Sequence, residues 1–238
     1  MFGQEGSRLR LEWGPEGVAA LGGSCAVLVI VDVLSFSTAA DIVVGRGGSV
    51  RPVRWADRER AARPADPAWT LRPSSLVTVP PGTELELPSP NGATLCALAE
   101  ATGAVVLAGC LRNARAVADA ARSLAAGGPI GVVPGGERWG VDILTNTGES
   151  GPLRPAVEDL LGAGAVVASL LGYGTASVEA ALAAEMFARA SVEDVLTGCV
   201  SGRELIAAGH AGDVALAAEL NASTAVPLLA DGVLRAAG

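Results

Sequence analysis

The stretch Ala26-Val-Leu-Val-Ile-Val31, which runs directly into Asp32, decides the fold class of this chain. Six apolar residues without alternation are typical of a strand buried on both faces, as in the interior of a mostly parallel sheet. Asp32 ends this strand, and Ser35, Ser37 and Thr38 follow at the start of the next helix pattern. Open α/β sheets bind their ligands at the carboxyl ends of their strands. The stretch therefore predicts an α/β fold and also the centre of the functional site.

The end of this strand has the chemistry of an anion or metal site. The first backbone N–H groups of a helix favour anions, and an aspartate beside them can bind a divalent cation. An ordinary helix cap beside a buried, hydrogen-bonded Asp32 explains the same residues. Both interpretations stay open on these residues alone.

Strand and helix patterns alternate along most of the chain. Strands are expected at residues 27–32, 50–53, 84–87, 104–108, 130–133 and 225–229, and helices at 37–44, 93–101, 113–126, 155–171, 177–189, 192–196, 203–208 and 214–220. This alternation predicts right-handed crossovers and a three-layer α/β/α fold with a mostly parallel or mixed sheet. No linker, repeat or low-complexity segment divides the chain, so we expect a single domain over residues 1–238 with a helix-rich C-terminal third.

Other segments show weaker patterns. Residues 55–63 favour an exposed helix or turn, and residues 64–75 favour an irregular, proline-rich loop. Residues 134–151 form a long polar stretch, which is typical of a functional lid or a disordered segment. Ser191-Val-Glu-Asp194 and Ser201-Gly-Arg-Glu204 match the capping box, in which a hydroxyl and an acid each bind a free backbone N–H at a helix start.

The composition excludes several classes of function. The formal charge is −8, which argues against a nucleic-acid partner because a phosphate backbone would be repelled. All 17 cationic residues are arginine, so lysine Schiff bases, pyridoxal phosphate anchoring and a P-loop lysine are excluded. His210 is the only histidine, so chemistry that needs a pair of histidines is excluded as well.

The sequence favours a cytoplasmic protein without a membrane partner. No apolar run reaches the roughly 18 residues that a membrane-spanning helix needs, and the N-terminus lacks the pattern of a signal peptide. Cys25, Cys96, Cys110 and Cys199 are scattered in apolar or glycine-rich surroundings, which favours reduced thiols over disulfides or a zinc cluster. A homodimer stays an open alternative.

Two further strand-to-helix junctions carry groups that bind anions. Asn91 and Gly92 precede a helix, where an Asn-Gly turn exposes backbone N–H groups. Arg112 follows the next strand and has the planar fork that binds an oxyanion, while Asn113 is a natural N-cap. A plain turn and a surface arginine before a capped helix explain the same residues, so this choice also stays open.

Two more junctions flank the long polar stretch. Arg138 follows the strand expected at 130–133, and Glu158 and Asp159 begin the helix after the stretch. Acids are favoured at a helix start by the helix dipole alone. Because neighbouring helical residues point in different directions, we expect only one of the two acids to face a site.

Several known phosphatase motifs are absent from the sequence. A haloacid-type phosphatase needs a second acid two residues after the first, but Leu34 stands there. A cysteine phosphatase needs an arginine six residues after the cysteine, but Ala116 follows Cys110 at that spacing. The chain also contains no P-loop, no Gly-x-Gly-x-x-Gly and no Gly-x-Ser-x-Gly.

Six segments occur in the order seen in the 2-phosphosulfolactate phosphatase family. They are Asp32-Val-Leu-Ser-Phe-Ser-Thr38, Pro90-Asn-Gly-Ala-Thr94, Arg112-Asn-Ala-Arg-Ala116, Gly136-Glu-Arg138, Glu158-Asp-Leu-Leu-Gly-Ala-Gly164 and Ser201-Gly-Arg-Glu-Leu205. Their shared order carries the resemblance, which covers residues 13–227. The resemblance implies a magnesium-dependent acid phosphatase with a three-layer α/β fold, acting on a 2-phosphorylated sulfonate on a route to coenzyme M. The family pattern has arginine directly after Asp-Val-Leu, where this chain has Ser35.

From these residues and the resemblance we expect metal-assisted hydrolysis of a phosphomonoester, with a small anionic phosphorylated substrate as the partner. Asp32, with Glu158 or Asp159, is the expected Mg²⁺ site, and Asp32 and Arg112 are the expected catalytic residues. Whether Asp32 is the nucleophile or only a metal ligand stays open. The expected substrate contacts are Ser35, Ser37, Thr38, Asn91, Gly92, Asn113, Arg138 and Arg203. A module that binds a phosphometabolite without turnover is the main alternative, and a phosphoryl or glycosyl transferase is a third.

Overall fold

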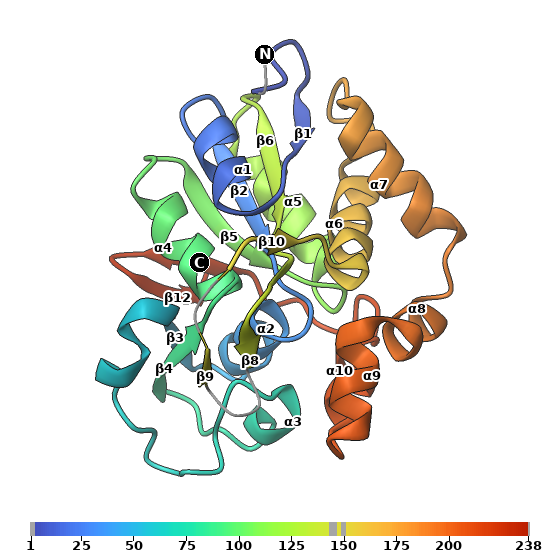
Figure 1. Ribbon diagram of the computed structural model, residues 1–238. Coiled ribbons are helices and arrows are strands. Elements are labelled where there is room, and N and C mark those ends of the chain that lie inside the picture. The colour runs from blue at the N-terminus through green and yellow to red at the C-terminus, as the bar shows by residue number, and fades with distance from the viewer. Residues whose placement is uncertain (1–2, 143–146, 149–150, 238) are drawn as a thin grey trace.

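The computed structural model describes residues 3–142, 147–148 and 151–237 of the chain. Its largest sheet has eight strands in the order β1-β6-β2-β5-β11-β12-β3-β4 (Figure 1). Their bounds are β1 Leu9–Leu11, β2 Val27–Val31, β3 Ser49–Arg54, β4 Glu84–Ser89, β5 Val105–Gly109, β6 Ile130–Pro134, β11 Pro227–Ala230 and β12 Val233–Ala236. The pairs among β1, β6, β2 and β5 are parallel, whereas β11 and β12 pair antiparallel to their neighbours. The sheet is therefore mixed, as predicted.

Helices cover both faces of this sheet. They are α1 Gly14–Leu21, α2 Phe36–Gly45, α3 Pro73–Leu76, α4 Gly92–Glu100, α5 Ala114–Leu124, α6 Val157–Leu170, α7 Val178–Arg189, α8 Val192–Gly198, α9 Val200–Ala207 and α10 Ala211–Ala217, with a 3₁₀ turn at Trp55–Arg60. Figure 1 shows α8, α9 and α10 gathered beyond the end of α6. None of the helices in the described residues is long and apolar enough to cross a bilayer.

The side chains of β2 show why the fold has three layers. Val29 and its alternate neighbours pack with α5, α6 and α7 in one apolar cluster. Leu28 and Ile30 point to the other face and pack with α2 and α4 in a second cluster. All five residues of β2 are buried, which confirms the expectation drawn from the unbroken apolar run.

The long polar stretch contains strands that we did not expect. β7 (Glu137–Arg138) pairs antiparallel with β10 (Leu153–Arg154), and β8 (Val141–Asp142) pairs with β9 (Thr147–Gly148). Two-residue strands are too short to show a hydrophobic period, so sequence patterns could not reveal them. The expected loop at 64–75 likewise contains the start of the short helix α3.

One of the two capping boxes begins its helix as predicted, and the other prediction is wrong. The Ser191 hydroxyl accepts a hydrogen bond from the Asp194 N–H at 3.4 Å, at the start of α8. α9, however, begins after Cys199, whose Sγ accepts from the Gly202 N–H at 3.3 Å. Ser201 therefore lies inside the helix, and its hydroxyl points to a carboxylate from a different element.

Candidate active site

Four carboxylates lie together beyond the carboxyl ends of β2 and β6. They are Asp32 after β2, Glu137 after β6, and Glu158 and Asp159 in the first turn of α6. The charge of Glu158 raises the pKa of each of the other three, so the four side chains lie within electrostatic range of one another. Asp32, Glu158 and Asp159 are almost fully buried. The expectation that only one of the two α6 acids faces the site is too narrow, because both belong to this carboxylate cluster.

Asp32 is held by the turn before α4. Its Oδ2 accepts hydrogen bonds from the Gly92 N–H at 2.7 Å and the Ser89 hydroxyl at 3.3 Å, and its Oδ1 accepts from the Phe36 N–H at 3.3 Å. A Cβ at position 92 would lie 2.6 Å from the Phe36 ring and 2.9 Å from Asp32 Oδ2, so only glycine allows this approach. Burial raises the pKa of Asp32 to about 6 against the effect of these hydrogen bonds.

Asp159 connects two loops of the site. Its Oδ1 accepts from the Val33 N–H at 2.7 Å and its Oδ2 accepts from the Gly136 N–H at 2.8 Å. The turn after β2 and the turn after β6 are therefore fixed relative to each other by one side chain. Burial and the charge of Asp32 hold the pKa of Asp159 well above its usual range.

Glu137 is a site residue that the sequence reasoning did not select. Its Oε2 accepts from Asn91 Nδ2 at 3.0 Å, and its Oε1 accepts from the Ser201 hydroxyl at 3.4 Å. Burial, followed by the charge of Asp32, raises the pKa of Glu137 to about 7. Its position in the sequence could have identified it as a site residue. Glu137 lies in Gly136-Glu-Arg138, directly after two glycines that end a buried strand.

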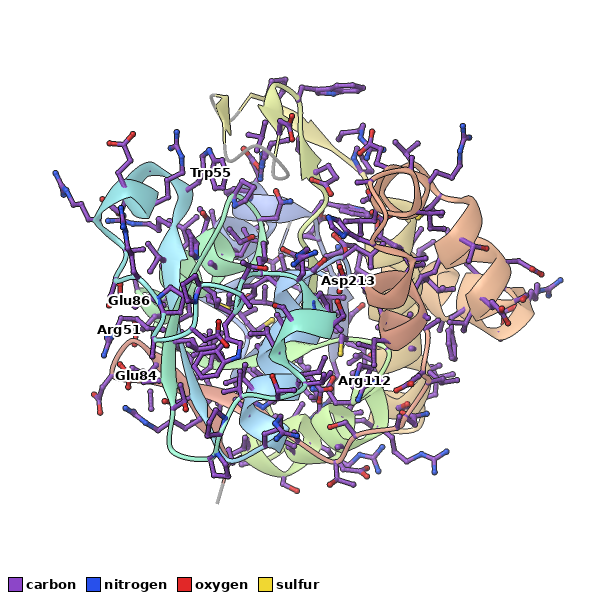
Figure 2. All side chains as sticks on the ribbon, turned by 90° about the horizontal axis from the view of Figure 1, so that it is seen from below. Arg51, Trp55, Glu84, Glu86, Arg112 and Asp213 are labelled. Atoms are coloured by element: carbon purple, nitrogen blue, oxygen red, sulfur yellow. The ribbon has the colours of Figure 1, made fainter. Side chains whose placement is uncertain are left out.

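A cavity of about 640 Å³ opens beside Glu137. Its walls come from Leu34 and Ser35, from Leu71, from residues 137–142 with Arg154, and from α9. The segment that carries Leu71 is attached to α10, because the Ser74 N–H donates to Asp213 Oδ1 at 2.7 Å; Figure 2 labels Asp213. The carboxylate cluster and this cavity together form the candidate active site.

The hydroxyls of Ser37 and Thr38, which we expected to bind phosphate, form hydrogen bonds with backbone groups. Ser37 Oγ accepts from the Asp32 N–H at 3.0 Å and donates to the Ile30 carbonyl at 3.2 Å. Thr38 Oγ1 donates to the Val33 carbonyl at 2.7 Å. The structure thus places both side chains in the turn that shapes the Asp32 loop.

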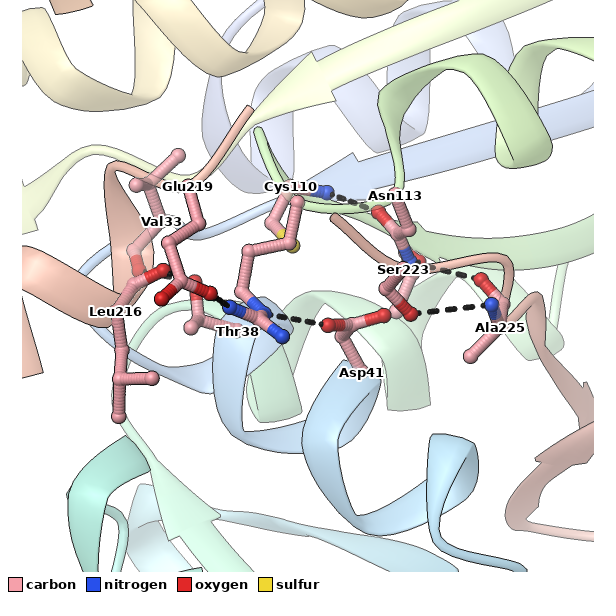
Figure 3. A network of polar contacts seen from close by, with 11 residues as sticks. Val33, Thr38, Asp41, Cys110, Asn113, Leu216, Glu219, Ser223 and Ala225 are labelled. Carbon is pink, nitrogen blue, oxygen red and sulfur yellow. Dashed lines mark hydrogen bonds and ion pairs between the residues drawn. The ribbon is translucent and has the colours of Figure 1, made fainter. Parts of the chain in front are cut away.

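Arg112 and Asn113 lie in a different polar network from the carboxylate cluster (Figure 3). Arg112 Nε donates to Asp41 Oδ2 at 2.9 Å, and its Nη1 donates to the Leu216 carbonyl and to Glu219. Asn113 accepts from the Cys110 N–H at 2.8 Å and donates to the Ala225 carbonyl at 3.2 Å. These bonds join the β5–α5 turn to α2, to α10 and to the segment before β11.

The two remaining predicted arginines have different surroundings. Arg138 lines the cavity, and its guanidinium lies close to Gly14 at the start of α1. Arg203 is exposed on α9 and is absent from the cavity wall. Ser35, by contrast, lies in the cavity wall as a substrate contact requires.

The donor set of the cluster fits a hard cation such as Mg²⁺. Within the described residues, no three or more His, Cys, Asp and Glu side chains are arranged to hold a metal ion. Mg²⁺ needs fewer protein ligands, since it keeps several waters and binds through one or two carboxylates. Asn91 Oδ1 is buried and has no hydrogen-bond partner in the described chain, so a hard oxygen is left over on a side chain that donates to Glu137 of the cluster. A cation would also relieve the repulsion between the carboxylates.

Comparison with known families gave one match. A family model for 2-phosphosulpholactate (2-phosphosulfolactate) phosphatase matches residues 77–232, about two thirds of the chain. The matched part contains Asn91, Glu137, Glu158 and Asp159, whereas Asp32 precedes it. A comparison with curated proteins found no significant match.

Proposed function

Because the chain belongs to the 2-phosphosulpholactate phosphatase family, we propose that it hydrolyses a small phosphorylated acid with the help of Mg²⁺. The name of the family describes hydrolases of a phosphoric monoester. The reaction that we propose is the conversion of 2-phosphosulfolactate to sulfolactate and phosphate, in cytoplasmic coenzyme M biosynthesis. The structural observation that carries this proposal is a buried carboxylate cluster, one member of which, Glu137, lines a cavity of about 640 Å³.

Asp32 and Glu158, with Asn91 Oδ1, would hold the metal ion. When bound, Mg²⁺ supplies positive charge that stabilises the phosphoryl oxygens in the transition state. Asp159 keeps these ligands in place, because it fixes the turn after β2 against the turn after β6. Gly92 has the same effect on Asp32 through its backbone N–H.

Glu137 is placed to transfer a proton. Its carboxyl lines the cavity, and both its oxygens have a fixed direction because Asn91 and Ser201 donate to them. With a pKa of about 7, Glu137 is protonated in a substantial fraction of molecules at neutral pH. Protonated Glu137 can donate to the oxygen that leaves when the phosphoester bond breaks.

A substrate panel tests this function. Phosphate release from 2-phosphosulfolactate, 2-phospholactate and unrelated phosphomonoesters would be measured with Mg²⁺ and with EDTA. We expect release from the small phosphorylated acids that requires Mg²⁺. Binding of these compounds without any release would instead support a phosphometabolite-binding module, and release unaffected by EDTA would contradict the metal site.

A further inference from the structure

The ribbon of β7 and β10 places three side chains on one face. Glu137 and Arg154 are direct partners in this antiparallel pair, so their side chains share a face. The Arg154 guanidinium carbon lies 5.8 Å from the centre of the Trp139 ring, two residues beyond Glu137. All three residues line the cavity of about 640 Å³.

Arg154 keeps its charge available to the cavity. Its positive charge lowers the pKa of Glu137, so the guanidinium acts on the carboxylate of the cluster that lines the cavity. The ion pairs within 4 Å in the described residues use Arg51, Arg54, Arg60, Arg112, Arg189 and Arg235 instead. Arg138, the other arginine of the cavity wall, has its guanidinium against α1.

The remaining charged groups of the wall are acidic. Glu137, Asp142 and Glu204 line the same cavity, so an anion that enters it meets carboxylates on several sides. An anionic group leaves water at a large cost unless a cation pairs with it. A substrate with a second anionic group therefore needs a cation in the cavity wall, and Arg154 is the arginine of the wall whose guanidinium is not held against α1.

We propose that Arg154 determines substrate specificity by binding the second anionic group, a carboxylate or sulfonate, of a phosphomonoester whose phosphate lies at the carboxylate cluster. This inference rests on the proposed function. The planar fork of arginine matches both kinds of anion, and contact with the Trp139 ring restrains the guanidinium before the substrate binds.

The test uses two substrates that differ only in the second anion. 2-Phospholactate carries a carboxylate where isopropyl phosphate carries a methyl group. Arg154→Met retains the unbranched stem of the side chain but removes the charged guanidinium. We expect kcat/KM for 2-phospholactate, relative to isopropyl phosphate, to fall by about tenfold or more, through KM rather than kcat.

Two further variants make the test specific. Ser35→Arg in the Arg154→Met background adds a guanidinium on another wall of the same cavity and should restore part of the preference. Arg189→Met removes an exposed arginine of α7, far from any predicted substrate contact in the sequence, and should leave the preference unchanged.

An unchanged preference in Arg154→Met, or an equal loss for both substrates, overturns the proposal. If the wild type releases phosphate from neither substrate, calorimetric titration with 2-phospholactate decides the proposal, and the proposed function fails if 2-phosphosulfolactate is not hydrolysed either. Weaker binding by Arg154→Met than by the wild type supports a role in anion binding, and equal binding overturns it.

Discussion

Replacing Asp32 with asparagine should change how the stability of the protein depends on pH. Burial raises the pKa of Asp32 from its ordinary value of 3.8 to about 6. At about 1.4 kcal/mol for each tenfold change in proton affinity, ionisation of Asp32 costs the folded state about 3 kcal/mol. Because the folded pKa lies above the unfolded one, the favourable contribution of neutral Asp32 is fully present below about pH 4. It is lost as the pH rises through about 6.

The D32N variant does not lose stability in this way as the pH rises, because asparagine does not ionise. The difference in free energy of unfolding, variant minus wild type, should therefore increase by about 3 kcal/mol between pH 4 and pH 7.5. Relief of Glu137 and Asp159 acts in the same direction, because the charge of Asp32 raises the pKa of both. Any loss of hydrogen bonds from Gly92 and Ser89 lowers the free energy of unfolding of D32N by the same amount at every pH. It therefore does not produce the predicted change of the difference with pH.

Urea unfolding followed by tryptophan fluorescence measures this difference. The series would run from pH 4 to pH 7.5 in EDTA, so that no divalent cation compensates the carboxylates. Asp119→Asn, which changes an exposed carboxylate on α5, is the matched control and should give a difference independent of pH. A difference between D32N and the wild type that stays constant with pH, or that falls as the pH rises, would refute the reasoning.

Three further predictions follow from the same geometry. Mg²⁺ should raise the melting temperature of the wild type at pH 7.5 but not that of D32N, as scanning calorimetry would show. Gly92→Ala should lower both stability and turnover because its Cβ would collide with Asp32, whereas Gly198→Ala, with open space around its Cβ, should fold normally. Arg112→Met leaves a buried carboxylate of α2 unpaired and should cost about 3 kcal/mol in urea unfolding; Arg115→Met, at an exposed site, should cost little.

The sequence allowed the central elements of the fold to be predicted for a clear physical reason. An unbroken apolar run such as β2 is buried on both faces, and this property is visible in the chain itself. β7 and β10 have two residues each, and their pairing joins segments on either side of a long stretch. No local pattern encodes such a pairing, so neither the ribbon nor the place of Arg154 in it could be predicted.

The sequence allowed only those site residues to be predicted that follow a strand or begin a helix. Asp32, Asn91, Glu158 and Asp159 lie where polar residues follow strands or begin helices, and the structure brings them together. The partners of Arg112 come from α2 and from beyond α10, and no local signal shows that they would surround this arginine. Arg112 as a catalytic residue therefore stays a prediction, and the structure adds an ion-pair network around it.

The central claim is that the carboxylate cluster carries out Mg²⁺-dependent hydrolysis of a phosphomonoester. The most direct measurement is kcat/KM for phosphate release from 2-phosphosulfolactate, with Mg²⁺, by the wild type, D32N and the exposed control Asp119→Asn. We expect D32N to lose about 10² or more, because it removes a charged ligand of the ion, while Asp119→Asn retains full activity. Wild-type activity in D32N, with its fold intact, would contradict the account.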